Sequence, residues 1–596
     1  MLIPLNPQPG IVSVNTDYTS QTRWIDADKV RFRYGRPEKI GGWESFLTDA
    51  ITGTPRTIHT WRQLNDYRNI ALGTESHLYV YSESLLTDAT PYRVTSHSLD
   101  ATDVDTTNTS STVNISYTTH GAKVGARVVF LGSLSIGGLT LDGEYTITNI
   151  VDADNFEFDA GSNATSTASG GSVNIALTIN PGTASAISGF GWGTGAWGSG
   201  TWGTARAASN VVLDMRVWSM DSYGEDLLSS YRKGPLYVWD ASAGGRSTAV
   251  TGTQVPAAVG LVRVTEDRHT ISAGATPQGS VIFDPMLVKW SNEEDYTDWD
   301  ITNTTNTAGE QILTQGNEIT AFVQGRSVSY IHTDTALYAM QDIGPPFVFG
   351  FNVLGEGCGC LGPNASTTVE DNVIWMGFGN FYIFDGSVRT LECPVIDKVF
   401  EDMNITQQEK VFAGLNRKFS EVWFFYPSAD STENDRYVLY NYREGTWSYG
   451  SIARTTWRDQ GLYQEPIATA PSGTVYKHEI GHNDDGAIMP AYAETGVFEA
   501  GGEDGVGQGD KMLYMDRIIP DVELDTGGEM TYTVYTRRYP NSTDITKGSL
   551  TVTPTTEKIS FRARGRQFRM RFETNDLDNG WRLGTNRMDI KVDGDR

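Results

Sequence analysis

Short aromatic strands separated by turn residues recur along this sequence, and they restrict the chain to an all-β fold. Residues 77–81, 234–240 and 380–386 each place a short strand of aromatic and β-branched side chains after a turn, and the strands of the last two end at Asp. Alternating side chains between turn formers are typical of strands. Hydrophobic residues make up 39% of the chain, which excludes wholesale disorder. We therefore expect a globular protein built almost entirely from strands.

The strands occur in pairs whose spacing is typical of a β-propeller. Residues 373–377 precede 380–386 as a hairpin, and residues 420–426 precede 436–441 in the same way. Such pairs return at intervals of roughly 40–60 residues, as the blades of a propeller do. A blade is a four-stranded sheet that packs against its neighbours around a ring. We expect a β-propeller-like body, and a series of β-sandwiches is the alternative.

Changes in composition divide the chain. Residues 98–180 are rich in Thr, Ser and Gly, poor in charge, and have the short alternating strands of a small β-barrel inserted into the main body. Residues 500–510 form a Gly-rich acidic linker, and a β-sandwich-like unit for docking follows. The predicted parts are 1–97 (N-terminal segment and first propeller strands), 98–180 (barrel), 181–499 (propeller body), 500–510 (linker) and 511–596 (C-terminal unit).

Helix and cysteine are both rare. One face of an amphipathic helix is predicted within residues 394–403, where apolar residues recur at helical spacing. The three cysteines, Cys358, Cys360 and Cys393, cannot form a closed set of disulfides. No second Cys or His pair stands at zinc-like spacing from them. We expect reduced cysteines in the core.

No segment of the sequence predicts a membrane span or an export signal. A spanning helix needs about 18 or more apolar residues in succession, and no stretch approaches that length. The first ten residues lack the basic and then apolar regions of a secretory signal peptide. We therefore expect a chain that is made in a cytoplasm and is not exported by that route.

Charge is unevenly distributed along the chain. The 596 residues contain 46 Lys and Arg against 73 Asp and Glu, a net charge of −27. Residues 21–43 and 561–596 each carry a net charge of +3, so the rest of the chain carries −33. One interpretation is a solvated acidic surface that keeps the protein soluble. The other is that basic ends dock on partners while an acidic body repels a polyanion, because phosphate binding relies on Lys and Arg.

One motif matches the H-E-x-x-H pattern of zinc proteases. In those enzymes two histidines lie one helical turn apart, with the glutamate as general base. Here His478, Glu479 and His482 follow a predicted strand at 474–477, and Gly481 lies inside the would-be helix. We interpret the motif as a chance match and predict no metal, no cofactor and no enzymatic activity. A glycosidase carboxylate pair is not visible in a sequence.

Two non-catalytic features are candidates for contacts between proteins. Trp192, Trp197 and Trp202 occur every five residues in the glycine-rich segment 190–203. Large rings on a tightly turning backbone suit an inter-subunit contact or a loop packed across a sheet. The second feature is an alternating run of Arg562, Arg564 and Arg566. Such a row is either an exposed edge kept soluble by charge or a docking surface for an acidic neighbour.

Several segments resemble those of a family of structural proteins from short-tailed bacteriophages, the tail nozzle or tail tubular protein B-like family. Residues 98–180 also resemble, over about 60 residues, a small β-barrel module that recurs in tailed-phage tail proteins. This insertion departs from the simplest nozzle members. The segments that carry the nozzle resemblance are 23–33, 37–43, 190–203, 223–228, 289–299 and 421–447.

The resemblance implies a function in the tail of a virion assembled in the host cytoplasm. Family members form a hexameric ring below the tail adaptor, and double-stranded DNA leaves through the lumen. The implied partners are other copies of the chain, the adaptor or other tail proteins, and the host surface or tail fibres. An acidic lumen would not grip DNA phosphates. The residues expected at subunit or adaptor contacts are Trp24, Arg31, Arg33, Trp43, Trp192, Trp197, Trp202, Arg562, Arg564 and Arg566.

Two other function classes remain open at the level of sequence. A tail-attached polysaccharide depolymerase would need a carboxylate pair in a groove with exposed aromatic residues. A glycan- or receptor-binding propeller would bind surface polysaccharide without turnover.

Overall fold

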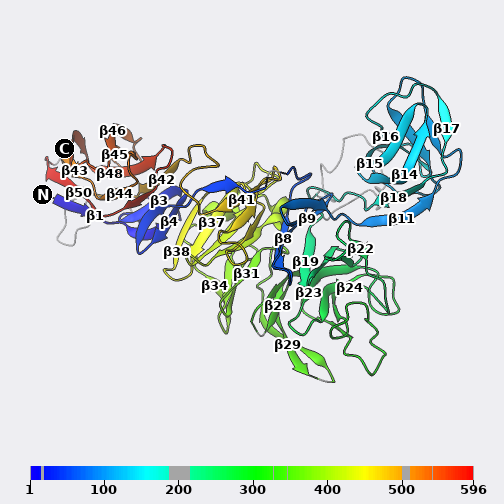
Figure 1. Ribbon diagram of the computed structural model, residues 1–596. Coiled ribbons are helices and arrows are strands. Elements are labelled where there is room, and N and C mark those ends of the chain that lie inside the picture. Colours follow the sequence, from blue (N-terminus) through cyan, green and yellow to red (C-terminus); the bar gives the residue numbers. More distant parts are fainter. Residues whose placement is uncertain are drawn as a thin grey trace, which may run out of the picture. The chain divides into compact units, whose positions relative to one another are not determined.

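The computed structural model describes residues 2–14, 16, 19–47, 49–186, 215–326, 328–344, 346–499, 511–539 and 541–594. Strands dominate the described residues, as expected (Figure 1). The chain forms two compact units. Unit 1 consists of Met1–Ala50, Val323–Met340 and Asn352–Arg596, and unit 2 consists of Ile51–Phe322 and Gln341–Phe351.

Unit 2 contains three consecutive four-stranded antiparallel sheets, whose first strands contact one another in order. Aromatic residues fill the spaces between the sheets: Trp61 of the first meets Trp239 of the second edge-on, with ring centroids 5.9 Å apart. The sheets are β7 (Thr57–Arg62), β8 (Arg68–Gly73), β9 (Leu78–Ser82) and β10 (Leu85–Asp88); β19 (Trp218–Tyr223), β20 (Asp226–Tyr231), β21 (Tyr237–Trp239) and β22 (Thr248–Ala249); and β23 (Val259–Val264), β24 (Thr270–Ala275), β25 (Asp284–Trp290) and β26 (Gly309–Ile312).

The predicted barrel is an eight-stranded sheet inserted between the first two of these sheets. Its strand order is β11-β18-β14-β15-β16-β13-β12-β17. It has its own core, in which Phe130, Phe156 and Phe158 are buried. The strands are β11 (Tyr92–Ser98), β12 (Val104–Thr106), β13 (Thr112–Ser116), β14 (Arg127–Ile136), β15 (Leu139–Ile150), β16 (Asn155–Asp159), β17 (Ala168–Gly170) and β18 (Asn174–Thr178).

Unit 1 contains three more sheets of the same kind, and the last is completed from the other end of the chain. In that sheet β6 (Trp43–Ser45) pairs with β41 (Val475–His478). Trp423 and Trp457 stack between the second and third sheets at 5.5 Å. The remaining strands are β31 (Ser366–Val369), β32 (Asn372–Met376), β33 (Phe381–Phe384) and β34 (Val388–Leu391); β35 (Phe412–Asn416), β36 (Glu421–Tyr426), β37 (Arg436–Asn441) and β38 (Thr446–Ser451); and β39 (Thr456–Arg458) and β40 (Ile467–Thr469).

One further four-stranded sheet lies between these groups in the sequence. Its strands are β27 (Ile319–Gln324), β28 (Ser329–Thr333), β29 (Ala336–Gly344) and β30 (Val348–Glu356). Between residues 43 and 478, the described chain therefore forms seven four-stranded sheets in sequence order. This arrangement confirms the all-β class with a propeller-like body, and the β32–β33 and β36–β37 pairs confirm both predicted hairpins.

The C-terminal unit is sandwich-like, and it includes the N-terminal strands. Its sheets run β1-β50-β43-β47, β2-β3-β42-β48-β45-β46 and β4-β5-β49-β44. The sequence grouped residues 1–97 together, whereas the pairing assigns β1–β5 to the C-terminal unit and β7–β10 to unit 2. The strands are β1 (Leu2–Leu5), β2 (Gln8–Ile11), β3 (Arg23–Asp28), β4 (Val30–Arg33), β5 (Arg36–Lys39), β42 (Ala491–Thr495), β43 (Leu513–Ile519), β44 (Val522–Leu524), β45 (Met530–Arg537), β46 (Ile545–Val552), β47 (Ile559–Gly565), β48 (Gln567–Thr574), β49 (Trp581–Leu583) and β50 (Asn586–Val592).

The predicted helix is present as α1 (Ile396–Asp402), followed by the 3-10 helix η2 (Ile405–Lys410). Asn404 caps η2, and its side chain accepts a hydrogen bond from the Thr406 amide. All three cysteines are free and buried, as expected, and burial raises the pKa of Cys360 to about 12. A thiol in that state is unreactive at neutral pH.

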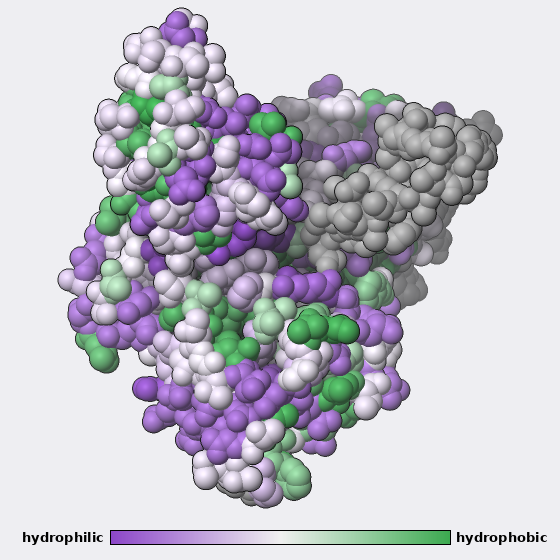
Figure 2. Space-filling view, turned by 90° about the vertical axis from the view of Figure 1, so that its right-hand side faces the viewer, coloured by the Kyte–Doolittle hydropathy of each residue, from purple (hydrophilic) through white to green (hydrophobic). Residues whose placement is uncertain are grey.

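The face shown in Figure 2 carries mainly hydrophilic residues, with hydrophobic residues in small separate groups among them. Scattered exposed apolar side chains are normal on a protein surface. Among the described residues, no helix combines the length and the hydrophobicity that crossing a membrane requires.

Candidate functional site

The aromatic residues predicted at contacts near the N-terminus are buried within the chain. Trp24 is 4% exposed, and its ring contacts Phe572 of the C-terminal unit at 6.0 Å. Trp43 is 3% exposed, and its Nε1 donates a hydrogen bond to Asp484 at 2.5 Å. Arg454 lies over the Trp43 ring, 4.8 Å from the centroid. These contacts hold strands of the same chain together, and neither ring offers a surface to a partner.

Only two of the three arginines predicted to form a C-terminal row share a strand face. Arg562 and Arg564 lie on the same exposed face of β47, and Arg564 pairs with Asp593 at 2.6 Å. Arg566 lies in the turn after β47, with its guanidinium 5.3 Å from the Tyr539 ring. The docking function of these arginines therefore stays a prediction. Trp192, Trp197 and Trp202 fall outside the described residues.

The H-E-x-x-H segment is not helical. The strand β41 ends at His478, and Glu479 and Gly481 have φ angles of 62° and 56° in the turn that follows. His478 is buried, and its Nε2 accepts a hydrogen bond from Arg454 Nε at 2.8 Å. Burial and the Arg454 charge lower the pKa of His478 well below its usual range. The sequence match therefore lacks the helical face on which zinc proteases hold their metal.

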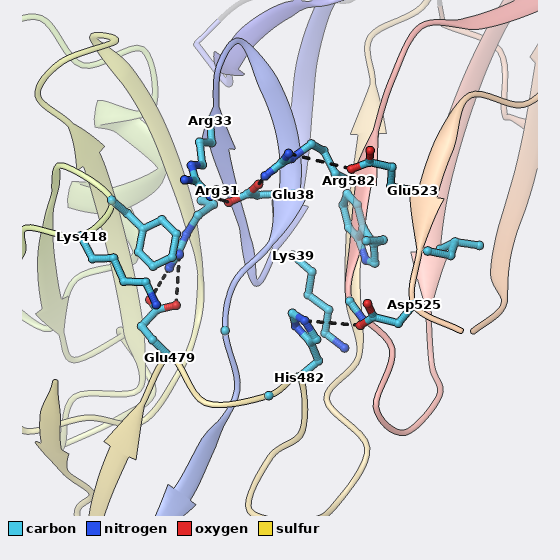
Figure 3. Close-up of a pocket in the computed structure, with 16 residues that line it drawn as sticks. Arg31, Arg33, Glu38, Lys39, Lys418, Glu479, His482, Glu523, Asp525 and Arg582 are labelled. Atoms are coloured by element: carbon cyan, nitrogen blue, oxygen red, sulfur yellow. Dashed lines mark hydrogen bonds and ion pairs between the residues drawn. The ribbon is translucent and has the colours of Figure 1, made fainter. Parts of the chain in front are cut away.

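Glu479 instead belongs to an ionic pocket of unit 1, with a cavity volume of about 390 Å³ (Figure 3). The N-terminal hairpin β4–β5, the turn after β35, the turn after β41 and the strands β44 and β49 line it. Its cationic side chains are Arg31, Arg33, Lys39, Lys418 and Arg582. Its carboxylates are Glu38, Glu479, Glu523 and Asp525. The pocket is thus a meeting point of both ends of the chain.

Arg31 is the buried centre of one wall. The side chain is 1% exposed, and its Nε lies 3.1 Å from Glu421 Oε1. Its Nη1 donates to Glu479 Oε2 at 3.1 Å, and Asn416 donates to the other oxygen of Glu479 at 2.9 Å. The guanidinium also lies 3.6 Å from the centroid of the Phe419 ring. Arg31 is therefore the single cation shared by two buried acidic groups, Glu421 and Glu479.

These contacts shift the pKa values of the buried pair in a common direction. Burial alone would lower the pKa of Arg31. The carboxylates of Glu421 and Glu479 outweigh this effect and raise the pKa above its usual value, so the guanidinium stays charged. Burial raises the pKa of Glu421, and the negative charge of Glu479 raises it too. The positive charge of Arg31 lowers this pKa but does not offset the other two effects. One cation shared between two carboxylates leaves the second acid harder to ionise.

The opposite wall is formed by the C-terminal unit. Arg582 donates to Glu38 Oε2 through Nε at 2.8 Å and through Nη2 at 2.6 Å, and this contact raises the pKa of Arg582. His482 Nε2 lies 3.4 Å from Asp525 Oδ2. The same Asp525 oxygen accepts a hydrogen bond from the Gly580 amide at 2.6 Å. A side chain at Gly580 would collide with the His482 ring, so a glycine is needed for this packing.

Lys39 lies in this wall with its charge buried. It is 4% exposed, and its Nζ donates to the Asn579 carbonyl oxygen at 3.0 Å. Burial lowers the pKa of Lys39 to about 8. Sequence reasoning missed Lys39, Lys418 and Arg582 as site residues. The basic excess of residues 21–43 and 561–596 could have indicated Lys39 and Arg582, because both segments meet here, but Lys418 lies outside them and no sequence feature indicated it.

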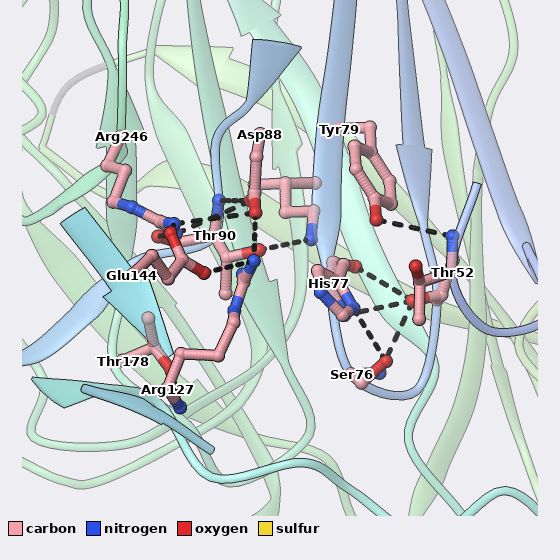
Figure 4. A network of polar contacts seen from close by, with 12 residues as sticks. Thr52, Ser76, His77, Tyr79, Asp88, Thr90, Arg127, Glu144, Thr178 and Arg246 are labelled. Atoms are coloured by element: carbon pink, nitrogen blue, oxygen red, sulfur yellow. Dashed lines mark hydrogen bonds and ion pairs between the residues drawn. The ribbon is translucent and has the colours of Figure 1, made fainter. Parts of the chain in front are cut away.

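A second polar cluster connects the inserted barrel to the first sheet of unit 2 (Figure 4). Arg127 of β14 contacts both Asp88 of β10 and Glu144 of β15. Arg246 contacts the same two carboxylates, with its Nη2 2.5 Å from Glu144 Oε2, and it donates to the Thr90 carbonyl oxygen at 2.9 Å. Two cations and two carboxylates thus balance one another where the barrel meets the sheet.

Comparisons with known proteins do not identify a family. No family model matches the chain, and no curated protein does. Among solved structures, the computationally designed Ika8 protein is 10% identical with a TM-score of 0.33, over 73% of this chain and 100% of that one. The extracellular domain of a putative hybrid two-component system from B. thetaiotaomicron is 10% identical with a TM-score of 0.32, over 96% and 78%. BamB from Moraxella catarrhalis is 13% identical with a TM-score of 0.26, over 45% and 84%.

Proposed function

We propose that this chain is a structural subunit of a phage tail, and that its copies form the oligomeric nozzle ring through which genomic DNA is ejected. The observation that carries the proposal is the charge distribution. Outside the two basic ends, the chain carries a net charge of −33. A conduit for DNA must not hold phosphates, and a wall poor in Lys and Arg releases few counterions on contact with DNA.

Arginines of both basic segments form ion pairs within the chain, and this supports a wall with few cations free to bind DNA. In unit 1, Arg31 and Arg582 form ion pairs with carboxylates of the same unit. Arg569 and Arg571 pair with Glu494 in the same way. Arg31 therefore links β4 to β36 and to the turn after β41, and Arg569, Arg571 and Arg582 form pairs between strands of the C-terminal unit. Cations committed to internal pairs add little attraction for a passing polyanion.

The architecture is also suited to a tail component. Propeller-like sheets, an inserted barrel and a sandwich-like unit are rigid antiparallel assemblies that leave most loops at the surface. Such units can present contacts to neighbouring copies and to an adaptor at once. The sequence resemblance to the nozzle family supplies the specific assignment.

The mass of the purified particle tests the proposal. Mass photometry at several protein concentrations should give a discrete multiple of the 65.4 kDa subunit, sixfold if the resemblance to the nozzle family holds. A monomer at every concentration, with and without the adaptor, would count against a ring. Release of oligosaccharide from host capsule by the same preparation would favour the depolymerase alternative instead.

A further inference from the structure

Three of the four carboxylates of the unit 1 pocket are held closely within the chain, whereas two of its cations have no ion pair. Glu479 is held by Arg31 and Asn416. Glu38 is held by Arg582, and Asp525 by His482 and the Gly580 amide. Glu523 is 83% exposed and contacts Arg582 only at 3.9 Å, so the charges that remain available in this pocket are this carboxylate at the solvent side and the two lysines.

The two available cations are Lys39 and Lys418. Within the described part of the chain, Lys39 donates to one carbonyl oxygen and has no close ion pair, and the carboxylates of Asp576 and Asp525 attract its charge from a longer distance. The Lys418 ammonium has no described carboxylate partner either, and it lies 5.3 Å from the Phe419 ring centroid. An ammonium has three donors, so each lysine retains hydrogen-bonding capacity.

These lysines come from opposite walls of the pocket. Figure 3 shows Lys418 on the side of the β35–β36 turn and Lys39 beside His482 on the side of the C-terminal unit. The ring nitrogen Nδ1 of His482 is buried and has no hydrogen-bond partner among the described residues. The cavity of about 390 Å³ lies within the size range of small-molecule sites.

We propose that this pocket binds a small oxyanion of the phosphate class, with Lys39 and Lys418 as its cationic ligands. Two separated ammonium groups suit a ligand with several negatively charged oxygens, because each lysine can contact a different oxygen. The 4% exposure of Lys39 places it beyond the reach of a rigid duplex, so the ligand is a small molecule and not nucleic acid. The proposal does not depend on the nozzle function.

Isothermal titration of the full chain with inorganic phosphate, at an ionic strength fixed with sodium chloride, tests the proposal. We expect saturable binding by the wild-type chain. The variants Lys39→Met and Lys418→Met should each raise the Kd for phosphate by about tenfold or more, as the loss of a charged hydrogen bond does. Lys398→Met is the matched control, because Lys398 is exposed on α1 and does not line the pocket. Its Kd should equal that of the wild type.

Two results would overturn the proposal. One is the absence of phosphate binding by the wild-type chain, and the other is an unchanged Kd in Lys418→Met. Lys418 is exposed, so its variant should fold whatever the buried Lys39 variant does. A short DNA duplex added as competitor should leave phosphate binding unchanged. Displacement of phosphate by the duplex would assign the site to nucleic acid and contradict a small-molecule ligand.

Discussion

Arg127 Nη1 lies 2.5 Å from Asp88 Oδ2, and this ion pair fastens the inserted barrel to the first sheet of unit 2. Arg246 and Glu144 complete a cluster of two cations and two carboxylates (Figure 4). The side chain of Arg127 is 13% exposed, so the cluster is largely shielded from solvent. The cluster therefore links the barrel, which has its own core, to β10 of that sheet.

Replacing Arg127 with Met should loosen the barrel. The change leaves Asp88 and Glu144 with one cation between them, at a cost of about 1–3 kcal/mol, between the values for exposed and fully buried pairs. Hydrogen exchange should increase in β18, which pairs with the Arg127 strand β14, and in β11, which pairs with β18. Arg62→Met is the control, because the Arg62–Asp66 pair lies on the same sheet but is largely exposed. Equal exchange in both variants would contradict a clamping function.

Replacing Arg31 with Met should destabilise unit 1 severely. Glu421 and Glu479 would remain buried without their shared cation. We expect this to lower the free energy of unfolding by about 3–5 kcal/mol. Urea unfolding followed by tryptophan fluorescence should show the transition of unit 1 at a lower midpoint. Arg417→Met removes a 3.7 Å contact with Asp459 in which the arginine is 66% exposed, and it should shift the midpoint little. A midpoint for Arg31→Met that matches this control would contradict the buried cluster.

Lys39 predicts a specific pH dependence of stability. Its pKa is about 8 in the folded chain and near 10.5 when unfolded, so between these values the unfolded chain binds more protons. We compare the free energy of unfolding of the wild type with that of Lys39→Met. The wild-type value minus the variant value should therefore rise as the pH increases from about 8 to about 10.5, by no more than about 3 kcal/mol. Thermal unfolding of both proteins across this range measures the difference. A difference independent of pH would show that Lys39 titrates normally.

Chelation should leave the protein unchanged. His478 contacts Arg454, Glu479 contacts Arg31, and His482 contacts Asp525, so the three motif residues have other partners. Within the described residues, no group of three or more His, Cys, Asp or Glu could hold a metal ion. Melting curves with and without EDTA, and with added zinc, should superimpose. A rise in Tm with zinc would indicate a metal site that involves other residues.

The local elements of the fold could be predicted from the sequence, but the long-range pairings could not. The alternating side chains that predict the hairpin of β36 and β37 lie within about twenty residues of one another. The glycines that predict the turns of the inserted barrel are likewise local signals. By contrast, β6 pairs with β41 and β1 pairs with β50, across most of the chain. Periodicity contains no information about which distant strand completes a sheet.

The candidate site was only partly predictable for the same reason. Arg31 was expected at a contact between proteins because its segment is basic, yet its partners Glu421 and Glu479 lie about 400 residues further along the chain. An arginine paired internally and an arginine paired with a neighbour have the same sequence pattern. Only the folded chain distinguishes the two, through burial and distance.

A cryo-EM map of the assembled particle tests the central claim most directly. The account expects several copies around an axial channel wide enough for a DNA duplex, with Asp and Glu side chains, not Lys or Arg, at its narrowest part. Carboxylates there would keep phosphates from binding the wall. A particle without an axial channel, or a channel ringed by arginine, would contradict the account.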